Sequence, residues 1–170
     1  MGSSSKIRLS LFFYKYIPII LLFISVLNES NINYTEIKYF SFNFTYILIF
    51  FYSLRRNQGL GYTYVFIAGL FNDAVVGTPM GLSSLMYLII CVTTAYIRNI
   101  TLRPSLIKDS IFFLSTILIV NSLTFISLNF VFEYQLYYFD QMMNIIFTFL
   151  MYFLFASIFH YFEDYFMDKS

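Results

Sequence analysis

Few residues of this chain could perform chemistry, and one aspartate is the most conspicuous of them. Asp73 lies in the segment GLFNDAVVGTPMG, from Gly69 to Gly81, within a stretch that is otherwise apolar. An acid in such a stretch is typical of a catalytic group, of a proton or ion pathway, or of a structural contact that offsets the cost of burial. The other groups in the chain decide among these three.

Catalysis and metal binding both need partners that the sequence does not supply. The chain has one histidine, His160, and one cysteine, Cys91. A zinc site needs three or four convergent ligands, and covalent catalysis needs a nucleophile beside a base. His160 lies beside Tyr161, Glu163 and Asp164, which is typical of an interfacial residue. We therefore predict that the chain is not an enzyme and that it holds no metal or cofactor.

A transport pathway is also poorly supported. Channels and proton-coupled transporters carry ionisable residues deep in several helices. Here Asp73 is the single acid that stands out within an apolar span, and Lys15 lies near a span end, where its stem can extend to the headgroups. Four asparagines are suited to hydrogen bonds between helices: Asn43, Asn121, Asn129 and Asn144. The interpretation that remains for Asp73 is a contact between helices.

The composition indicates a membrane protein. Of the 170 residues, 59% are apolar, 23% are aromatic and 11% are charged, whereas a soluble domain has about a quarter charged residues. The net charge of +1 gives no reason to expect nucleic acid as a partner. We predict that the first apolar run is a retained membrane helix, because Lys6 breaks the myristoylation pattern and no good leader cleavage site follows.

Six apolar segments are candidates for membrane helices, since a helix needs roughly 20 residues to cross about 30 Å of hydrocarbon. Ser41, Asn43 and Thr45 interrupt the second segment, which predicts a tilted or partly buried helix there. We predict one all-α membrane domain over residues 1–170, with helices at about 9–27, 37–54, 61–76, 79–97, 111–130 and 141–162.

The basic residues predict that both ends of the chain are cytoplasmic. Lys and Arg are retained on the cytoplasmic side of short loops. With the N-terminus inside, every Lys and Arg except Lys38 falls on that side. A five-span alternative would place one group of basic residues on the wrong side. The acids in or beside the outer loops are Glu29, Glu36, Glu133 and Asp140.

The third predicted helix has a face of small and polar residues. Gly69, Asp73 and Gly77 are each four residues apart, so they share one side of the helix, with Phe66 and Leu70 beside them. Glycines at this spacing let a neighbouring backbone approach closely, which gives van der Waals contact where lipid offers no hydrophobic driving force. This face is expected to meet protein rather than lipid.

The turn after this helix predicts a tie between two helices. Thr78 before Pro79 has the form of an N-cap followed by proline at the first helical position. Asp73 lies about one turn before the end of the third helix, so its carboxylate is expected to reach the free amides at the start of the fourth. Gly77 and Gly81 are expected to keep that approach open.

The segment from Arg55 to about Asn99 carries a recognisable pattern. It has a basic turn RRNQG, a third helix ending in GLFNDAVVGTPMG and a fourth that opens with LSSLMYLI. This pattern resembles the bacterial rod shape-determining MreD family, whose members have a Gly-apolar-Asp segment followed by a Gly-x-Pro-apolar-Gly turn. Chain length and helix count agree with that family over the remainder. The matching positions here are Gly69, Asp73, Gly77, Pro79 and Gly81.

The resemblance implies a non-catalytic, multi-pass subunit of the cell-elongation (rod) complex in the bacterial inner membrane. Its partners would be an MreC-like scaffold protein, an MreB-like filament protein and a RodA-type glycosyltransferase with its transpeptidase. By scaffolding or regulating them it would help to maintain rod shape and guide peptidoglycan synthesis. The family's helical arrangement is similar to that of the substrate-binding components of energy-coupling-factor transporters, which leaves room for a small-ligand pocket.

Two other functions remain open from the sequence. One is a membrane transport subunit that binds a vitamin-like solute and needs an energising partner. The other is a membrane enzyme of lipid or wall metabolism, which the lack of paired acids disfavours. The first candidate for partner contact is the motif Gly69, Asp73, Gly77, Thr78, Pro79 and Gly81. The second, for which orientation and headgroup binding are simpler interpretations, is the set of inner arginines Arg55, Arg56, Arg98 and Arg103.

Overall fold

The computed structural model describes residues 16–27, 42–55, 60–100, 105–133 and 137–167, and every regular element in these ranges is a helix. This confirms the prediction of an all-α chain for the described part. The helices are an N-terminal one (Tyr16–Leu27), α2 (Phe44–Leu54), α3 (Tyr62–Val76), α4 (Leu82–Ile100), α5 (Leu106–Ile126), which continues as a π-helix (Ser127–Val131), and α6 (Tyr138–Met167).

Helix length and surface chemistry both indicate a membrane protein. Among the described residues, three helical segments are long and apolar enough to cross a membrane, namely Leu82–Ile100, Leu106–Val131 and Tyr138–Tyr161. The N-terminal helix, α2 and α3 are apolar but shorter. Many large apolar side chains point outward, such as Ile107, which is 72% exposed. Such a surface is unfavourable in water but is well solvated by lipid.

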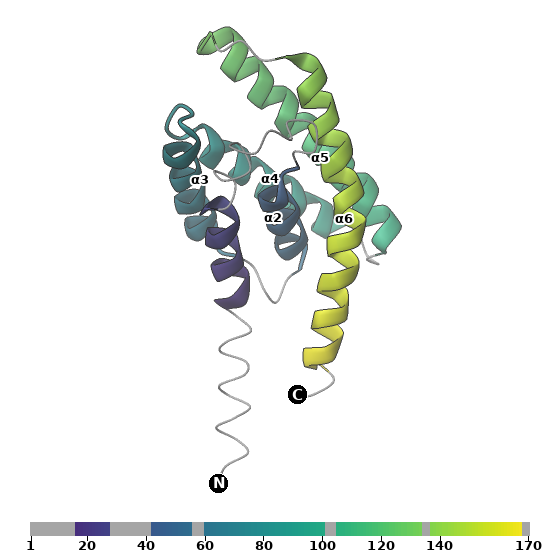
Figure 1. Ribbon diagram of the computed structural model, residues 1–170. Helices are drawn as coiled ribbons and strands as arrows, with labels where there is room; N and C mark the ends of the chain where they lie inside the picture. Colours follow the sequence, from purple (N-terminus) through teal and green to yellow (C-terminus); the bar gives the residue numbers. More distant parts are fainter. Residues whose placement is uncertain (1–15, 28–41, 56–59, 101–104, 134–136, 168–170) are drawn as a thin grey trace.

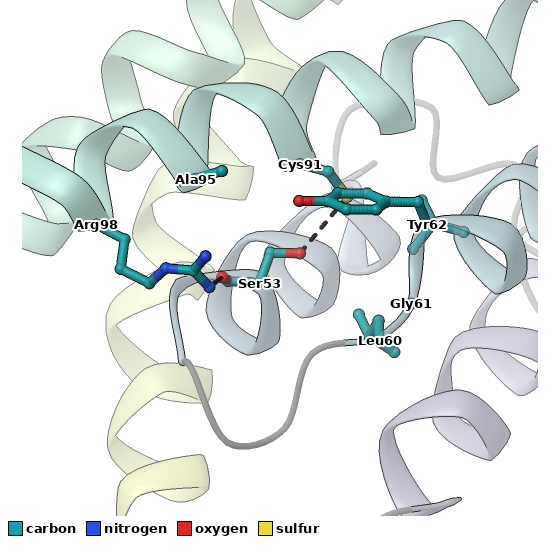
Figure 2. Close-up of a pocket in the computed structure, with 8 residues that line it drawn as sticks. Ser53, Leu60, Gly61, Tyr62, Cys91, Ala95 and Arg98 are labelled. Atoms are coloured by element: carbon teal, nitrogen blue, oxygen red, sulfur yellow. Dashed lines mark hydrogen bonds between the residues drawn. The ribbon is translucent and has the colours of Figure 1, made fainter.

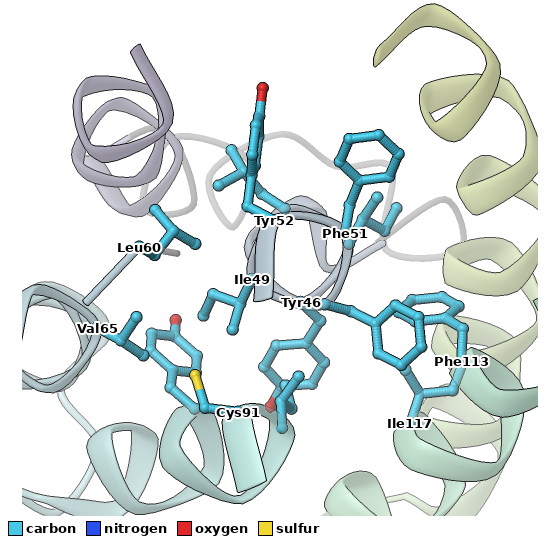
Figure 3. Close-up of a cluster of buried hydrophobic side chains, with 14 of the residues drawn as sticks. Tyr46, Ile49, Phe51, Tyr52, Leu60, Val65, Cys91, Phe113 and Ile117 are labelled. Carbon is cyan, nitrogen blue, oxygen red and sulfur yellow. The ribbon is translucent and has the colours of Figure 1, made fainter. Parts of the chain in front are cut away.

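α2 is the central helix of the fold (Figure 1). Its sequence FTYILIFFYSL is apolar on all sides, which is typical of a helix without a solvent-facing side, and Thr45 to Tyr52 are all buried. Figure 3 shows its side chains extending toward several neighbouring helices. The prediction of a partly buried second helix is therefore confirmed. The predicted helix is not continuous from Ile37, since Phe42 and Asn43 are not helical and α2 begins at Phe44.

The late start of α2 has a hydrogen-bonding cause. The backbone N–H of Asn43 donates to Oγ1 of Thr148 (3.0 Å), and its side-chain amide donates to Oδ1 of Asn144 (3.2 Å). Both acceptors lie on α6. A non-helical backbone group within a membrane needs a partner of this kind, and Thr148 supplies it for the N–H of Asn43. Residues 37–41 of the predicted helix lie outside the described residues.

This contact leads to a prediction for Thr148→Val. The variant keeps the shape of the side chain but removes the oxygen that accepts from Asn43, so it should lower the free energy of unfolding by about 1 kcal/mol. The matched control is Thr94→Val, because the Thr94 hydroxyl is equally buried but bonds only to carbonyls of its own helix. Unfolding by SDS titration in detergent micelles measures both. Equal losses would contradict an α2–α6 contribution from Thr148.

An aromatic cluster joins α2 to α5 and α6. The ring centroid of Phe113 lies 5.1 Å from that of Phe50 and 4.3 Å from that of Tyr152, with which it stacks at 18°. Phe50 and Tyr152 meet edge to face at 5.8 Å. Each such pair adds about 0.5–1.5 kcal/mol beyond the burial of its area. The cluster therefore fixes α2 to one helix pair, while α4 joins it to α3 on the other side.

The two helix pairs surround α2 (Figure 1), and α4 also packs on α5. α3 packs on α4, and α5 packs on α6. The start of the N-terminal helix at Tyr16 and the end of α6 lie on the same side of the molecule, and the α3–α4 turn lies on the other (Figure 1). α6 has 30 residues and extends beyond the predicted 141–162 at both ends. At 1.5 Å per residue it is about 45 Å long, which exceeds the hydrocarbon thickness.

The start of α5 also differs from the prediction. The helix begins at Leu106 rather than near Ile111. Ser105 is its N-cap, in an extended conformation, with Oγ accepting from the amide of Lys108 at 3.4 Å. α3 agrees with its predicted range, and so does the described end of the N-terminal helix, whereas residues 9–15 lie outside the described residues. The extra turn of α5 matters because it places an acid inside the helix.

Candidate functional site: the α3–α4 hairpin

Two glycines shape the turn between α3 and α4. Gly77 follows the last residue of α3 in the left-handed conformation (φ 79°, ψ 23°), and its N–H donates to the carbonyl oxygen of Asp73 at 2.9 Å. Gly81, with φ 96°, immediately precedes α4. A residue with a Cβ is strained at such angles, so glycine is favoured at both places. Together they reverse the chain within a few residues.

The carboxylate of Asp73 caps α4 from the preceding helix. Its Oδ2 accepts from the N–H of Gly81 at 2.7 Å, and its Oδ1 accepts from the N–H of Ser83 at 3.0 Å and from the Thr78 hydroxyl at 2.8 Å. The first amides of a helix lack intrahelical acceptors and carry the positive end of its dipole. Asp73 is only 1% exposed. These bonds agree with the predicted tie between Asp73 and the fourth helix.

The predicted cap of α4 is wrong. The sequence predicts Thr78 as the N-cap of a helix that begins at Pro79, but α4 begins at Leu82. The N–H of Leu82 instead donates to the carbonyl of Pro79 at 3.1 Å, in a turn before the helix. Thr78 donates its hydroxyl to Asp73. A charged carboxylate accepts more strongly than a neutral hydroxyl, so Asp73 takes the capping role and Thr78 becomes one of its donors.

Gly69 is the point of closest approach between α3 and α4. A Cβ placed there would lie 2.4 Å from Cα and 2.5 Å from N of Ser84. The hydroxyl of Ser84 donates to the carbonyl oxygen of Phe66 at 2.9 Å, which closes the same contact. The predicted close packing holds at Gly69 but not at Gly77 or Gly81, where a Cβ would meet nothing within 4 Å. Those two glycines serve the turn and not the helix contact.

Two serines, Ser83 and Ser84, complete the hairpin, and neither is predicted from the sequence as part of it. Besides the Ser84 contact, the side-chain amide of Asn72 donates to Oγ of Ser83 at 3.1 Å. The sequence feature that could have indicated both contacts is the serine pair directly after Gly81 and Leu82. Short hydroxyl side chains in a first helical turn allow close packing and also supply hydrogen bonds. The pair therefore faces the part of α3 that carries Gly69 and Asn72.

A second polar group, Arg55 with His160, lies at the C-terminal end of α2. Nη2 of Arg55 lies 2.8 Å from Nε2 of His160, and its guanidinium carbon lies 4.1 Å from the centre of the Phe51 ring. The interpretation of His160 as a simple interfacial residue is thus incomplete, because the ring also contacts the end of α2. Arg56 and Arg103 lie outside the described residues.

A second buried acid belongs to this end of the molecule. Asp109 lies in the first turn of α5 and is 7% exposed. The prediction that Asp73 is the only acid to stand out within an apolar span is therefore wrong. Arg55 supplies an opposite charge to Asp109, and the α5 N-terminus favours an acid. No group of three His, Cys, Asp or Glu side chains that could hold a metal ion occurs within the described ranges.

Comparison with known proteins assigns no family to the chain. A scan against protein-family models, a search of curated proteins and a search of solved structures each gave no match. The resemblance to the MreD family therefore depends on the motif in the α3–α4 hairpin, together with length and helix count. What the geometry offers at that motif is a rigid turn held by hydrogen bonds.

Proposed function

We propose that this chain is a non-catalytic subunit of the bacterial cell-elongation complex, as its resemblance to the MreD family implies. The observation that carries the proposal is the closed α3–α4 hairpin. Three motif residues have separate mechanical roles in it: Gly69 permits the helix contact, Asp73 caps α4, and Gly77 ends α3. A motif whose residues together close one hairpin suits a scaffold that presents a surface to partners.

The proposed topology has six membrane helices with both termini in the cytoplasm of a bacterial inner membrane. It is supported by the basic residues and by the positions of Tyr16 and the end of α6 on the same side of the molecule (Figure 1). α2 has 11 residues, which is short for a membrane crossing. We count it as one because its neighbours enclose it. In this orientation the α3–α4 hairpin lies toward the outer face of the membrane, with Met80 70% exposed at its tip.

The partners in this proposal are those of the elongation machinery. They are an MreC-like scaffold protein, an MreB-like filament protein and a RodA-type glycosyltransferase with its transpeptidase. The chain would hold or regulate these proteins through helix surfaces and turns, and the partners would perform the wall chemistry. Met80 at the hairpin tip and Phe71 on α3, which is 53% exposed, offer apolar side chains for such contacts.

A vitamin-type transport subunit is the alternative function. Pockets for solutes of that size are commonly about 300–1,000 Å³. The cavity that the structure describes between α2, α3 and α4 measures about 190 Å³, which is small for such a solute. The scaffold function is favoured by the motif in the α3–α4 hairpin, not by the size of this cavity.

Depletion in a rod-shaped bacterium that encodes the chain tests the proposed function. Cells that lose a subunit of the elongation complex should become round and swollen, because side-wall synthesis is no longer guided along the cell. Microscopy of cell width and length measures the change, with re-expression of the wild-type chain as the control. An unchanged outline would contradict the proposal.

Purification from cross-linked membranes separates the two functions. Mass spectrometry of the purified chain should recover wall-synthesis proteins together with it if the scaffold function is right. Recovery of a bound vitamin-like solute without those proteins would instead support the transport subunit. The Asp73→Leu variant serves as a comparison, since it should recover less of any partner that contacts the hairpin.

A further inference from the structure

A small cavity opens between α2, α3 and α4, at the opposite end of these helices from the Asp73 hairpin. Its volume is about 190 Å³. Figure 2 shows Tyr62 extending over Cys91, with Arg98 and Ser53 on the neighbouring side. Three side chains, those of Leu60, Val65 and Ala95, supply apolar lining. The cavity thus combines a charged group, hydroxyl groups and a thiol with an apolar wall.

Arg98 gives this cavity a positive charge. Its Nη1 donates to the backbone carbonyl oxygen of Ser53 at 3.4 Å, which partly neutralises the negative end of α2. No carboxylate in the described ranges forms an ion pair with Arg98. A guanidinium has five N–H donors in a fixed fork, and within the described residues one of its nitrogens is engaged, at Ser53. The lining therefore presents donors of the kind that bind a phosphate group.

The start of α3 adds to the same positive field. Gly61 occupies the N-cap position and has no side chain to accept from the first amides of the helix. Gly61 and Tyr62 both line the cavity. The positive end of the α3 dipole and the Arg98 guanidinium therefore act on the same space. The Tyr62 hydroxyl, on a side chain that is 59% exposed, can move to donate to a bound group.

We propose that this cavity binds the phosphate of an anionic phospholipid in the cytoplasmic leaflet. In the orientation that the basic residues predict, its mouth lies at the cytoplasmic membrane surface, where anionic headgroups are abundant and basic pockets between helices bind them. The apolar wall at Leu60 and Val65 suits the part of the lipid next to the phosphate. This site depends on the membrane orientation and not on membership of the elongation complex.

Cys91 provides a direct reporter of occupancy, because it is the only cysteine in the chain and lines the cavity. The experiment measures how fast a small methanethiosulfonate reagent modifies Cys91 in the full chain, reconstituted in nanodiscs of phosphatidylcholine with or without phosphatidylglycerol. Phosphatidylglycerol should slow the modification. Arg98→Gln should weaken this protection about fivefold, as expected for the loss of one basic group near the membrane surface.

Lys108→Gln is the matched control, since Lys108 is an exposed basic residue at the start of α5 that does not line the cavity. It should keep the full protection. Arg98→Lys should keep part of it, because it retains the charge but loses the planar fork. This variant also covers the case in which Arg98→Gln does not fold.

Three results would overturn the proposal. The first is equal modification rates with and without phosphatidylglycerol. The second is an equal loss of protection in the Arg98 and Lys108 variants. The third is protection by inorganic phosphate or glycerol 3-phosphate in phosphatidylcholine nanodiscs that equals the protection by phosphatidylglycerol, since the site would then take a soluble anion and not specifically a lipid.

Discussion

Replacing Gly69 with alanine is expected to force α3 and α4 apart and to lower the free energy of unfolding by about 1–3 kcal/mol, the usual cost of overpacking. The new Cβ would lie 2.4 Å from the Cα of Ser84. Because this neighbour is backbone, no rotamer change can relieve the clash. Separation of the helices would also lengthen the hydrogen bonds that the N–H groups of Gly81 and Ser83 donate to Asp73. SDS titration in micelles measures the loss.

Two further variants test the cause of that loss. Ala74→Val adds bulk to the same helix at an exposed position, so it should leave stability nearly unchanged. Gly69→Ala combined with Ser84→Ala removes the Ser84 Oγ that would lie 2.8 Å from the new carbon but leaves Cα and N in place. No recovery is therefore expected in the double variant. Recovery would mean that the side chain and not the backbone limits the approach.

The close contact and the tie could be predicted from the sequence because they are local. Asp73 binds amides that are only eight and ten residues further along the chain. A turn of that length brings the end of one helix to the start of the next, whatever the rest of the fold does. Gly69 lies one helical turn before Asp73, so it shares the same face. Spacing alone was sufficient for both residues.

The cap of α4 could not be predicted by the same means. Thr78 followed by Pro79 has the form of a helix start, and propensity considers one helix at a time. The deciding group is a carboxylate on another helix, which accepts from Gly81 and Ser83. Competition between acceptors on different elements is a tertiary effect. It moved the helix start to Leu82.

Contacts between segments far apart in the sequence could not be predicted for a related reason. Arg55 and His160, like Asn43 and Thr148, are 105 residues apart. α2 is apolar on all sides, so no periodic pattern marks the side that faces α6. The polar residues around Asn43 did predict a tilted or partly buried second helix, but their hydrogen-bond partners depend on how α6 lies along α2. The sequence thus indicated burial of this helix without its partners.

Asp73→Leu is expected to reduce stability more than any other single substitution in the hairpin. It removes the acceptor of three donors, the N–H groups of Gly81 and Ser83 and the hydroxyl of Thr78. A hydrogen bond to a charged group contributes about 1.5–3 kcal/mol. Asp73→Asn should lose less, because an amide keeps one acceptor oxygen and turns its NH₂ toward one of the donors. Thr78→Val should lose least, since it removes only one donor.

The loss in free energy of unfolding should be largest for Asp73→Leu, smaller for Asp73→Asn and smallest for Thr78→Val. Unfolding in micelles measures this order, and partner recovery from membranes is measured for the same variants. Asp140→Leu is the matched control, because Asp140 is an exposed acid in the first turn of α6. An exposed acid near a helix start contributes only through the dipole, about 0.3–1 kcal/mol. If Asp73→Leu costs no more than Asp140→Leu, the carboxylate does not hold α4 to α3. If stability falls in the predicted order while partner recovery stays unchanged, Asp73 supports the hairpin but the partners bind elsewhere.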